Sequence, residues 1–312
     1  MRHQKGHVFK KGSSWYVRWY ENVYRDGALV KAQPCKKIAD VCDRYRNKAD
    51  VRALADEVLR PINTGKVRPE STLTLAEYGD FHFMPHVEAD LKPSTHNGYK
   101  WIWNTYIKPR AEKIPMRDFR CVDATTMLAD IHAEHGLGRQ SLRHCKSVLS
   151  AVFTYAKQQG VIDGINPVMD AAIPRKAAKS KPTHAATPTE VSEMLNVLSG
   201  NAKVAVALMF FAGLRPGECR GLKWSDYDGK LLHVRRAVWN THVSDPKTED
   251  SIAPVPVADT LREILDEHRS TCSGSEWILC GQTNQPLDLH NLAARTIKPT
   301  LKEAKAQGKF SG

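Results

Sequence analysis

A stretch of twenty residues with little apolar content divides this chain. Residues 170–189 read DAAIPRKAAKSKPTHAATPT, with Ile173 as their one large apolar side chain. They carry three prolines and four basic residues, namely Arg175, Lys176, Lys179 and Lys181. A segment of this composition buries too little apolar surface to form a packed layer. It predicts a basic linker over 169–186 between separately folded parts.

A second break lies at 61–72, where Pro61, Gly65, Pro69 and Ser71 predict another linker. Three parts therefore remain, at 1–60, 73–168 and 187–312. Of the net charge of +12, residues 1–70 hold +8 and residues 173–190 hold +3. Such an excess favours a polyanionic partner, nucleic acid first. For an isolated run of charge, a solvated basic surface is the plainer explanation.

The first part, 1–60, predicts a small three-stranded sheet followed by a helix. Trp15, Val17 and Trp19 alternate with polar neighbours at strand period. Residues 47–60 then carry apolar side chains at helical spacing. Arg18 and Tyr20 fall on the face opposite the two tryptophans. They are candidate nucleic-acid contacts, with an ordinary solvated face as the alternative.

The second part, 73–168, predicts about four helices. The clearest runs over 139–159 and ends before Gly160. Its apolar stripe consists of Leu142, Cys145, Val148, Leu149, Val152, Phe153 and Ala156. Three earlier helices are assigned the following side chains: Leu73, Tyr78 and Phe81 to the first, Tyr99, Trp101, Ile102 and Tyr106 to the second, and Asp123 as the cap of a short third. The spacing predicts a compact helical bundle.

The third part, 187–312, predicts a mixed α+β domain. Thr187 begins a helix, 204–212 is a buried helix, and Pro216 opens a short helix. Strands are predicted over 231–238 and 252–257, and helices over 259–269 and 288–307. The chain as a whole is expected to be mainly α with small β elements.

Two short motifs in this third part point to chemistry. Arg215, within GLRPGE, lies in a tight break between two helices, beside a helix N-terminus that favours phosphate. The alternative is a cation that caps the 204–212 helix. Lys247 lies in the tip of a predicted hairpin, within PKT, from which it can reach a facing cleft. The alternative is a solvated edge lysine that deters aggregation.

In their order along the chain, these motifs resemble the tyrosine recombinases of the phage-integrase type. The resemblance also includes LKPST at 91–95, FTYAKQQGVIDGINPV at 153–168 and the basic linker. It implies an arm-type DNA-binding module at 1–60 and a helical SAM-like core-binding domain at 73–168. Residues 187–312 then correspond to the N-terminal part of the catalytic domain.

The resemblance also implies roles for individual residues. Arg215 matches the first catalytic arginine, which binds the scissile phosphate, and Lys247 matches the lysine that protonates the leaving 5′-oxygen. Glu218 matches an acidic residue that orders the site. Lys92, Thr95 and the four basic linker residues become candidate DNA contacts. The implied partner is double-stranded DNA at core sites, with arm sites left open, and family members assemble on it as tetramers.

The family's second catalytic block is not found in these 312 residues. His290 is followed three positions later by Ala293, so the HxxR pattern fails there, and Arg295 is out of register. The last tyrosine is Tyr227, which precedes the predicted hairpin. Without a nucleophile, strand cleavage is not expected. The expectation is a C-terminally truncated integrase of a mobile element or prophage that binds DNA, with its tetramer assembly left open.

The sequence gives little support to a metal or cofactor site. The pairs His82/His86 and His132/His135 lack a third ligand, so no metal is expected, and no other cofactor is implied. Seven scattered cysteines and a charged N-terminus without a signal sequence favour a cytoplasmic, nucleoid-associated protein without membrane contact. Two alternatives to the integrase remain open: a non-catalytic regulator that competes for recombination sites, and a single-strand or RNA binder that stacks bases on the Trp/Tyr sheet.

Overall fold

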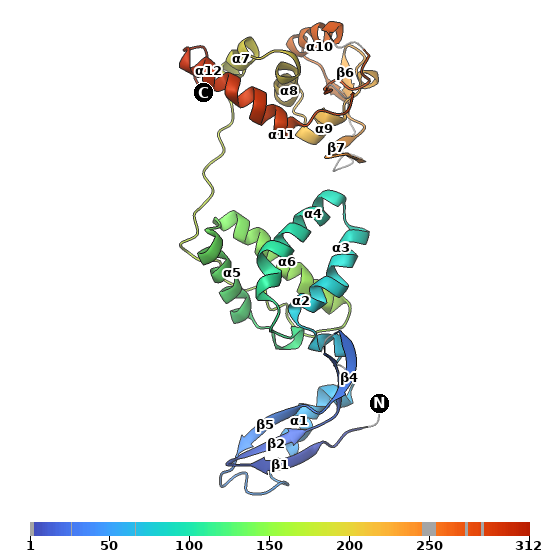
Figure 1. Cartoon of the computed structure of the whole chain (residues 1–312), viewed down its shortest axis with the longest axis vertical. Coiled ribbons are helices and arrows are strands. Elements are labelled where there is room, and N and C mark those ends of the chain that lie inside the picture. Colours follow the sequence, from blue (N-terminus) through green and yellow to red (C-terminus); the bar gives the residue numbers. More distant parts are fainter. Residues whose placement is uncertain (1–2, 26, 66, 245–253, 272–273, 282–283) are drawn as a thin grey trace. The chain divides into compact units, whose positions relative to one another are not determined.

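The computed structural model describes residues 3–25, 27–65, 67–244, 254–271, 274–281 and 284–312. The chain divides into two compact units, an N-terminal unit of residues 1–181 and a C-terminal unit of residues 182–312. Figure 1 shows the chain and its helices and strands. None of the described helices is long and apolar enough to span a membrane.

The N-terminal unit opens with a three-stranded antiparallel sheet in the order β1 (His7–Lys11), β2 (Ser14–Arg18) and β5 (Cys35–Asp40). The helix α1 (Arg52–Asn63) packs on it. Trp15, Val17 and Trp19 are buried, so the predicted sheet, its inward face and the following helix are confirmed.

The helix α1 lies further along the chain than predicted. Residues 46–50 form a turn instead, because Asp50 accepts from the backbone N–H groups of Arg46 and Asn47. At the other end the helix runs through Pro61 to Asn63. Ile62 is buried there, and Thr64 donates its backbone N–H to the carbonyl of Arg60.

The sequence did not predict the hairpin of β3 (Glu21–Arg25) and β4 (Ala28–Ala32). It contacts the helical part of the same unit. Tyr24 donates its backbone N–H to the hydroxyl of Thr72 at 2.9 Å, and Arg117 pairs with the buried carboxylate of Glu21 at 2.5 Å. Thr72 closes a 3-10 turn, Pro69–Thr72, within the segment predicted as a linker.

The helical bundle consists of two continuous but irregular helices and two regular ones. They can be followed in Figure 1. The first runs from α2 (Leu75–Tyr78) through a π turn, Gly79–Phe83, into α3 (Met84–Asp90). The second runs from α4 (Pro93–Ile102) through a π turn, Trp103–Ile107, and a 3-10 turn, Lys108–Arg110. A further 3-10 turn, Met116–Asp118, precedes α5 (Cys121–His135) and α6 (Arg139–Gln158). All seven side chains of the predicted α6 stripe are buried, as expected.

Two aromatic residues assigned to this core are on the surface. Phe81 is 63% exposed and Trp101 is 60% exposed, whereas Phe83 and Trp103 are buried. Each helix contains a π turn at this point, and the extra residue of a π turn shifts the apolar stripe relative to regular 3.6-residue spacing. Asp123 takes part in capping, but from a different position than predicted. It is the third residue of α5, which has 15 residues, and its carboxylate accepts from the backbone N–H of the N-cap residue Arg120.

The first half of the basic segment packs on the bundle. Ala171 and Ala177 are buried, and Arg139 donates its backbone N–H to the carbonyl of Ala178 at 2.8 Å. The ammonium group of Lys146 on α6 donates to the carbonyls of Met169 and Ala171, both at 2.8 Å. Residues 179–186 have no regular secondary structure.

The C-terminal unit begins with α7 (Pro188–Val197), capped as predicted by Thr187 in a capping box with Glu190. The largely buried α8 (Gly200–Phe211) and the short α9 (Pro216–Gly221) follow. Later come α10 (Asp259–Thr271) and a helix that runs from α11 (Leu289–Leu292) through a π turn, Ala293–Ile297, into α12 (Lys298–Ala306). These elements agree with the predicted helices.

The strands of this unit differ from the prediction. The single strand expected over 231–238 is two strands, β6 (Leu231–His233) and β7 (Ala237–Trp239). They separate because Arg235 and Arg236 between them turn to the buried carboxylate of Asp226. β6 pairs with β9 (Pro254–Pro256), and β7 pairs with β8 (His242–Ser244) in a tight hairpin.

Candidate functional site

Arg215 is the N-cap residue of α9, directly after the turn at Gly213 that ends α8. Its backbone N–H donates to one carboxylate oxygen of Glu218 at 2.8 Å, and its guanidinium Nη1 donates to the other at 2.7 Å. The side chain of Glu218 is 6% exposed, whereas that of Arg215 is 56% exposed. A buried carboxylate thus holds a guanidinium that still presents part of its surface to solvent.

A buried cysteine follows Glu218 on the same short helix. Cys219 is fully buried, and burial raises the pKa of its thiol to about 12, with the charge of Glu218 as a second cause. A thiol with this pKa is uncharged at neutral pH, so it serves as packing behind Arg215. The role predicted for Glu218, to order the site, stays a prediction.

A second ionic cluster lies just past the C-terminal end of α9. The carboxylate of Asp226, which is fully buried, accepts from Arg236 at 2.5 Å, from Arg235 at 3.4 Å and from the backbone N–H of Lys223 at 2.9 Å. Arg236 also donates to the carbonyl of Gly221 at 3.0 Å. The cluster fixes the end of α9 to the segment that leads into β7. The sequence did not predict it, because Asp226 and Arg236 are ten residues apart in irregular backbone.

Three further residues were weighed for the catalytic motifs: Lys247, which the resemblance implies, and His290 and Arg295, which fail the HxxR pattern. Lys247 is outside the described residues. His290, in α11, and Arg295, in the following π turn, are both exposed.

Tyr227 is the last tyrosine of the sequence, and it is buried. Its hydroxyl donates to the carboxylate of Asp266 at 3.2 Å. Burial, with the neighbouring charge of Asp266, raises the pKa of this phenol. A buried phenol that is bonded to a carboxylate and resists ionisation is a structural group rather than an exposed nucleophile.

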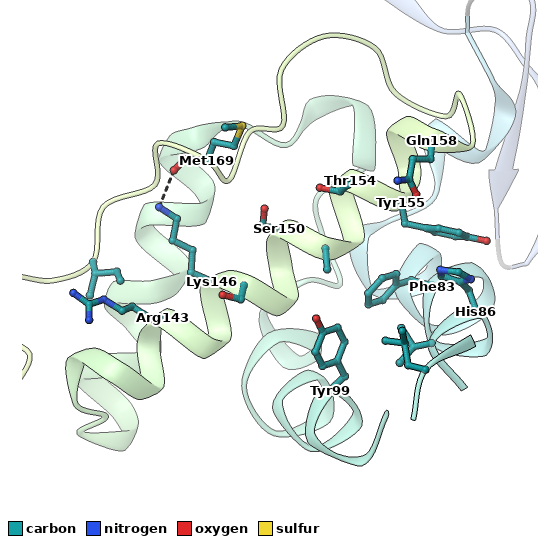
Figure 2. A pocket seen from close by; sticks show the side chains of 15 residues that line it. Phe83, His86, Tyr99, Arg143, Lys146, Ser150, Thr154, Tyr155, Gln158 and Met169 are labelled. Carbon is teal, nitrogen blue, oxygen red and sulfur yellow. Dashed lines mark hydrogen bonds between the residues drawn. The ribbon is translucent and has the colours of Figure 1, made fainter. Parts of the chain in front are cut away.

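In the N-terminal unit, a groove of about 840 Å³ opens along α6. Figure 2 shows one wall made by polar side chains that follow a single face of α6. They are Arg143, Lys146, Ser147, Ser150, Thr154 and Gln158. Phe83, His86 and Tyr99 line the groove from the π turn before α3, from α3 and from α4 (Figure 2). The prediction for α6 covered only its buried stripe, although its polar residues recur at helical spacing on another face.

The predicted DNA contacts of this unit all lie on its surface. All eight residues are exposed, namely Arg18, Tyr20, Lys92, Thr95, Arg175, Lys176, Lys179 and Lys181. Arg18 stacks over the ring of Phe9 at 5.3 Å, and Lys31 stacks over the ring of Tyr20 at 4.6 Å. Lys92 and Thr95 lie at the start of α4.

The histidines of the two spaced pairs make other contacts. His86 pairs with Asp90 at 2.9 Å and stacks on Tyr155, and His132 contacts the carbonyl of Leu137 at 2.9 Å. In the part of the chain that the structure describes, no group of three or more His, Cys, Asp or Glu side chains is placed to hold a metal ion.

Comparison with known sequences gives two curated relatives, while no protein-family model matches. A XerC-like tyrosine recombinase of Caldanaerobacter subterraneus subsp. tengcongensis is 26% identical over 247 residues, which is 72% of this chain and 62% of the relative. The ICEBs1 integrase of Bacillus subtilis strain 168 is 24% identical over 193 residues, which is 59% of this chain and 51% of the relative. The chain thus spans between half and two thirds of the length of these relatives.

Solved structures show the same fold. The Tn1549 transposon integrase, in complex with a circular intermediate DNA, has a TM-score of 0.64 at 17% identity and covers 75% of this chain and 79% of its own. A lambda integrase tetramer bound to a Holliday junction has a TM-score of 0.56 at 18% identity, over 98% of this chain and 85% of that one. In sequence the chain is thus similar to two tyrosine recombinases, and it shares the fold of the transposon and lambda integrases.

Proposed function

We propose that this chain binds double-stranded DNA at the recombination sites of a mobile element, with Arg215 on a backbone phosphate. The observation that carries the proposal is the guanidinium of Arg215, held at 2.7 Å by a buried carboxylate yet more than half exposed. A guanidinium has five N–H donors in a planar fork that suits phosphate, and one fixed in this way loses little side-chain freedom on binding. In the family's reaction such a group offsets the charge that develops on the phosphorus.

The N-terminal unit supplies a surface for the duplex. The polar face of α6, with Arg143 and Lys146, suits a groove of DNA, and Arg175, Lys176, Lys179 and Lys181 suit the phosphate backbone beside it. Arg18 and Tyr20 on the sheet, and Lys92 and Thr95 on α4, are further proposed contacts. The partners would be core sites and, for the sheet module, arm sites. A DNA-bound role would place the chain on the nucleoid in the cytoplasm.

We further propose that this 312-residue polypeptide binds DNA without cutting it. Tyr227 is buried, and the sequence after Lys247 offers neither a tyrosine nor an HxxR pattern. The role that the resemblance implies for Lys247, protonation of the leaving 5′-oxygen, requires a nucleophile that attacks the phosphate. The 312 residues offer no exposed tyrosine for that attack after Lys247. These features also support the second candidate, a regulator that competes for recombination sites. Tetramer assembly is not required by either proposal.

Binding and cleavage can be tested separately on the full chain. Fluorescence anisotropy with a random-sequence 30-bp duplex, competed by either of its single strands, should show duplex preference. The logarithm of the affinity should fall linearly with the logarithm of the salt concentration. Replacing Arg175, Lys176, Lys179 and Lys181 by Gln should reduce that slope by up to about 0.9 for each phosphate that the chain no longer neutralises.

The matched control for the basic segment replaces four exposed lysines at the other end of the chain, namely Lys298, Lys302, Lys305 and Lys309. Arg215→Ala should weaken binding while leaving the circular dichroism spectrum unchanged. Preference for single strands, or a salt-insensitive affinity, would refute duplex binding. Nicking of a supercoiled plasmid by the purified polypeptide would refute the proposal that it does not cut.

A further inference from the structure

Arg220, near the C-terminal end of α9, bonds to three backbone carbonyls from two distant segments. Its Nε donates to Leu287 at 2.8 Å, just before α11. Its Nη1 donates to Val238 at 3.3 Å in β7, and its Nη2 donates to Asn240 at 2.8 Å in the turn of the β7–β8 hairpin. One side chain therefore connects the helix that begins at Arg215 with a hairpin and with the start of another helix.

The backbone around Arg220 is packed too closely for the helix and the hairpin to move apart freely. A Cβ atom on Gly221 would lie 2.5 Å from the carbonyl oxygen of Arg236, so the two segments touch through backbone there. Asn240 has a φ of +49°, a conformation that most residues avoid, and its carbonyl is one of the three acceptors. The guanidinium of Arg220 thus holds a tight turn in place against α9.

The effect of Arg220 also reaches the start of α11. Asp288 caps this helix by accepting from the backbone N–H groups of His290 and Asn291. These bonds, that from Asn291 above all, lower the pKa of Asp288, and the charge of Arg220 adds to the effect. Because Arg220 bonds to the carbonyl of Leu287, the residue before Asp288, its charge also favours the charged, helix-capping form of Asp288.

We propose that Arg220 is a positioning residue that keeps the β7–β8 hairpin and the start of α11 in fixed register with Arg215. This anchoring role does not depend on the proposed function; only the expected effect of Arg220 on DNA binding does. Lys247 follows Ser244, the last residue of β8, by three positions in the sequence. Anchoring the hairpin would therefore set where the chain departs toward Lys247, relative to the guanidinium of Arg215. A lysine at position 220 could not make all three bonds, because its single ammonium does not have the planar spread of donors.

Hydrogen exchange measured by mass spectrometry tests the anchor in the full chain without DNA. Arg220→Gln and Arg220→Lys are compared with Arg262→Gln, whose guanidinium pairs with the exposed Asp259 at the start of α10. Exchange over 237–244 and 288–292 should rise at least tenfold in Arg220→Gln, and less in Arg220→Lys. Exchange over 204–208, in the buried α8, should not change. Unchanged exchange in the hairpin, or an equal rise throughout the C-terminal unit, would overturn the proposal.

A double-mutant cycle tests the consequence at the DNA. Arg220→Gln should weaken duplex binding several-fold, and adding Lys247→Ala should then weaken it much less than Lys247→Ala does alone. Fully additive effects would show that Arg220 acts on stability and not on the placement of the hairpin, and would overturn the positioning role. If the unaltered chain bound no duplex, the proposed function would fail, while the exchange experiment would still decide the anchor.

Discussion

The carboxylate of Asp226 accepts a hydrogen bond from the guanidinium of Arg236 at 2.5 Å, and no part of the Asp226 side chain is exposed. The same carboxylate caps a 3-10 turn, Trp224–Asp226, through the backbone N–H of Lys223. Its partner arginine is 21% exposed. A buried carboxylate with these bonds fixes irregular backbone that apolar packing alone would leave undetermined.

Replacing Asp226 by Ala should lower the free energy of unfolding of the C-terminal unit by about 3 kcal/mol, because Arg236 loses its buried partner. Urea unfolding, with hydrogen exchange of α8 to report on this unit, measures the change. Asp259→Asn is the control: its carboxylate is 82% exposed, so an effect below about 0.5 kcal/mol is expected. Equal effects of the two substitutions would contradict the structural role of Asp226.

Two glycines of the bundle should respond in opposite directions to alanine. A Cβ on Gly79 would lie 1.9 Å from the ring of the buried Trp103, so Gly79→Ala should destabilise the N-terminal unit by about 2 kcal/mol. Gly98, in the exposed α4, has no atom within 4 Å of such a Cβ. Gly98→Ala should stabilise that unit by up to about 1 kcal/mol.

Thermal unfolding of both variants checks this pair. A Gly79→Ala variant as stable as the unaltered chain would show that Trp103 can move away. The π turns would then not determine which side chains of these two helices are buried.

The cysteines should differ sharply in reactivity. Burial raises the pKa of Cys145 to about 11 and that of Cys219 to about 12, so neither forms much thiolate at pH 8. Cys35 and Cys42 are exposed. Iodoacetamide at pH 8, followed by peptide mass spectrometry, should therefore label Cys35 and Cys42 quickly and the buried pair only after urea is added. Fast labelling of Cys219 in the folded chain would contradict its burial on the helix that begins at Arg215.

The capping box of α7 should depend on pH in the acid range. The backbone N–H of Thr187, with help from His184, lowers the pKa of Glu190 below its ordinary value of 4.5. A carboxyl group whose pKa is lowered by folding stabilises the folded state above its unfolded pKa, and this stabilisation is lost as the pH falls through the folded pKa. The start of α7 should thus loosen below about pH 4.5.

A carboxyl titration by NMR measures this pKa directly. In His184→Ala the pKa of Glu190 should rise but remain below 4.5, because the bond from Thr187 is the larger cause. A pKa at or above 4.5 in the unaltered chain would show that the cap does not form.

Three features that local pattern predicted correctly join residues that are neighbours both in sequence and in space. The apolar stripe of α6, the capping box of Thr187 and Glu190, and the start of α9 at Pro216 all depend on contacts within one or two helical turns. The pairing of Arg215 with Glu218 spans three residues. Short-range chemistry of this kind is determined by residue type and spacing, so the sequence by itself determined the order of the helices and the place of the candidate site.

Only the tertiary structure decided which partners meet across the chain. Regular periodicity placed Phe81 and Trp101 in the core. In the structure each of the two helices contains a π turn, Phe83 and Trp103 are buried instead, and Trp103 packs against Gly79. Arg220 meets Leu287 across 67 residues, a contact that local periodicity does not encode. The physical reason is that such bonds depend on the relative placement of whole elements, which the summed packing of the core fixes.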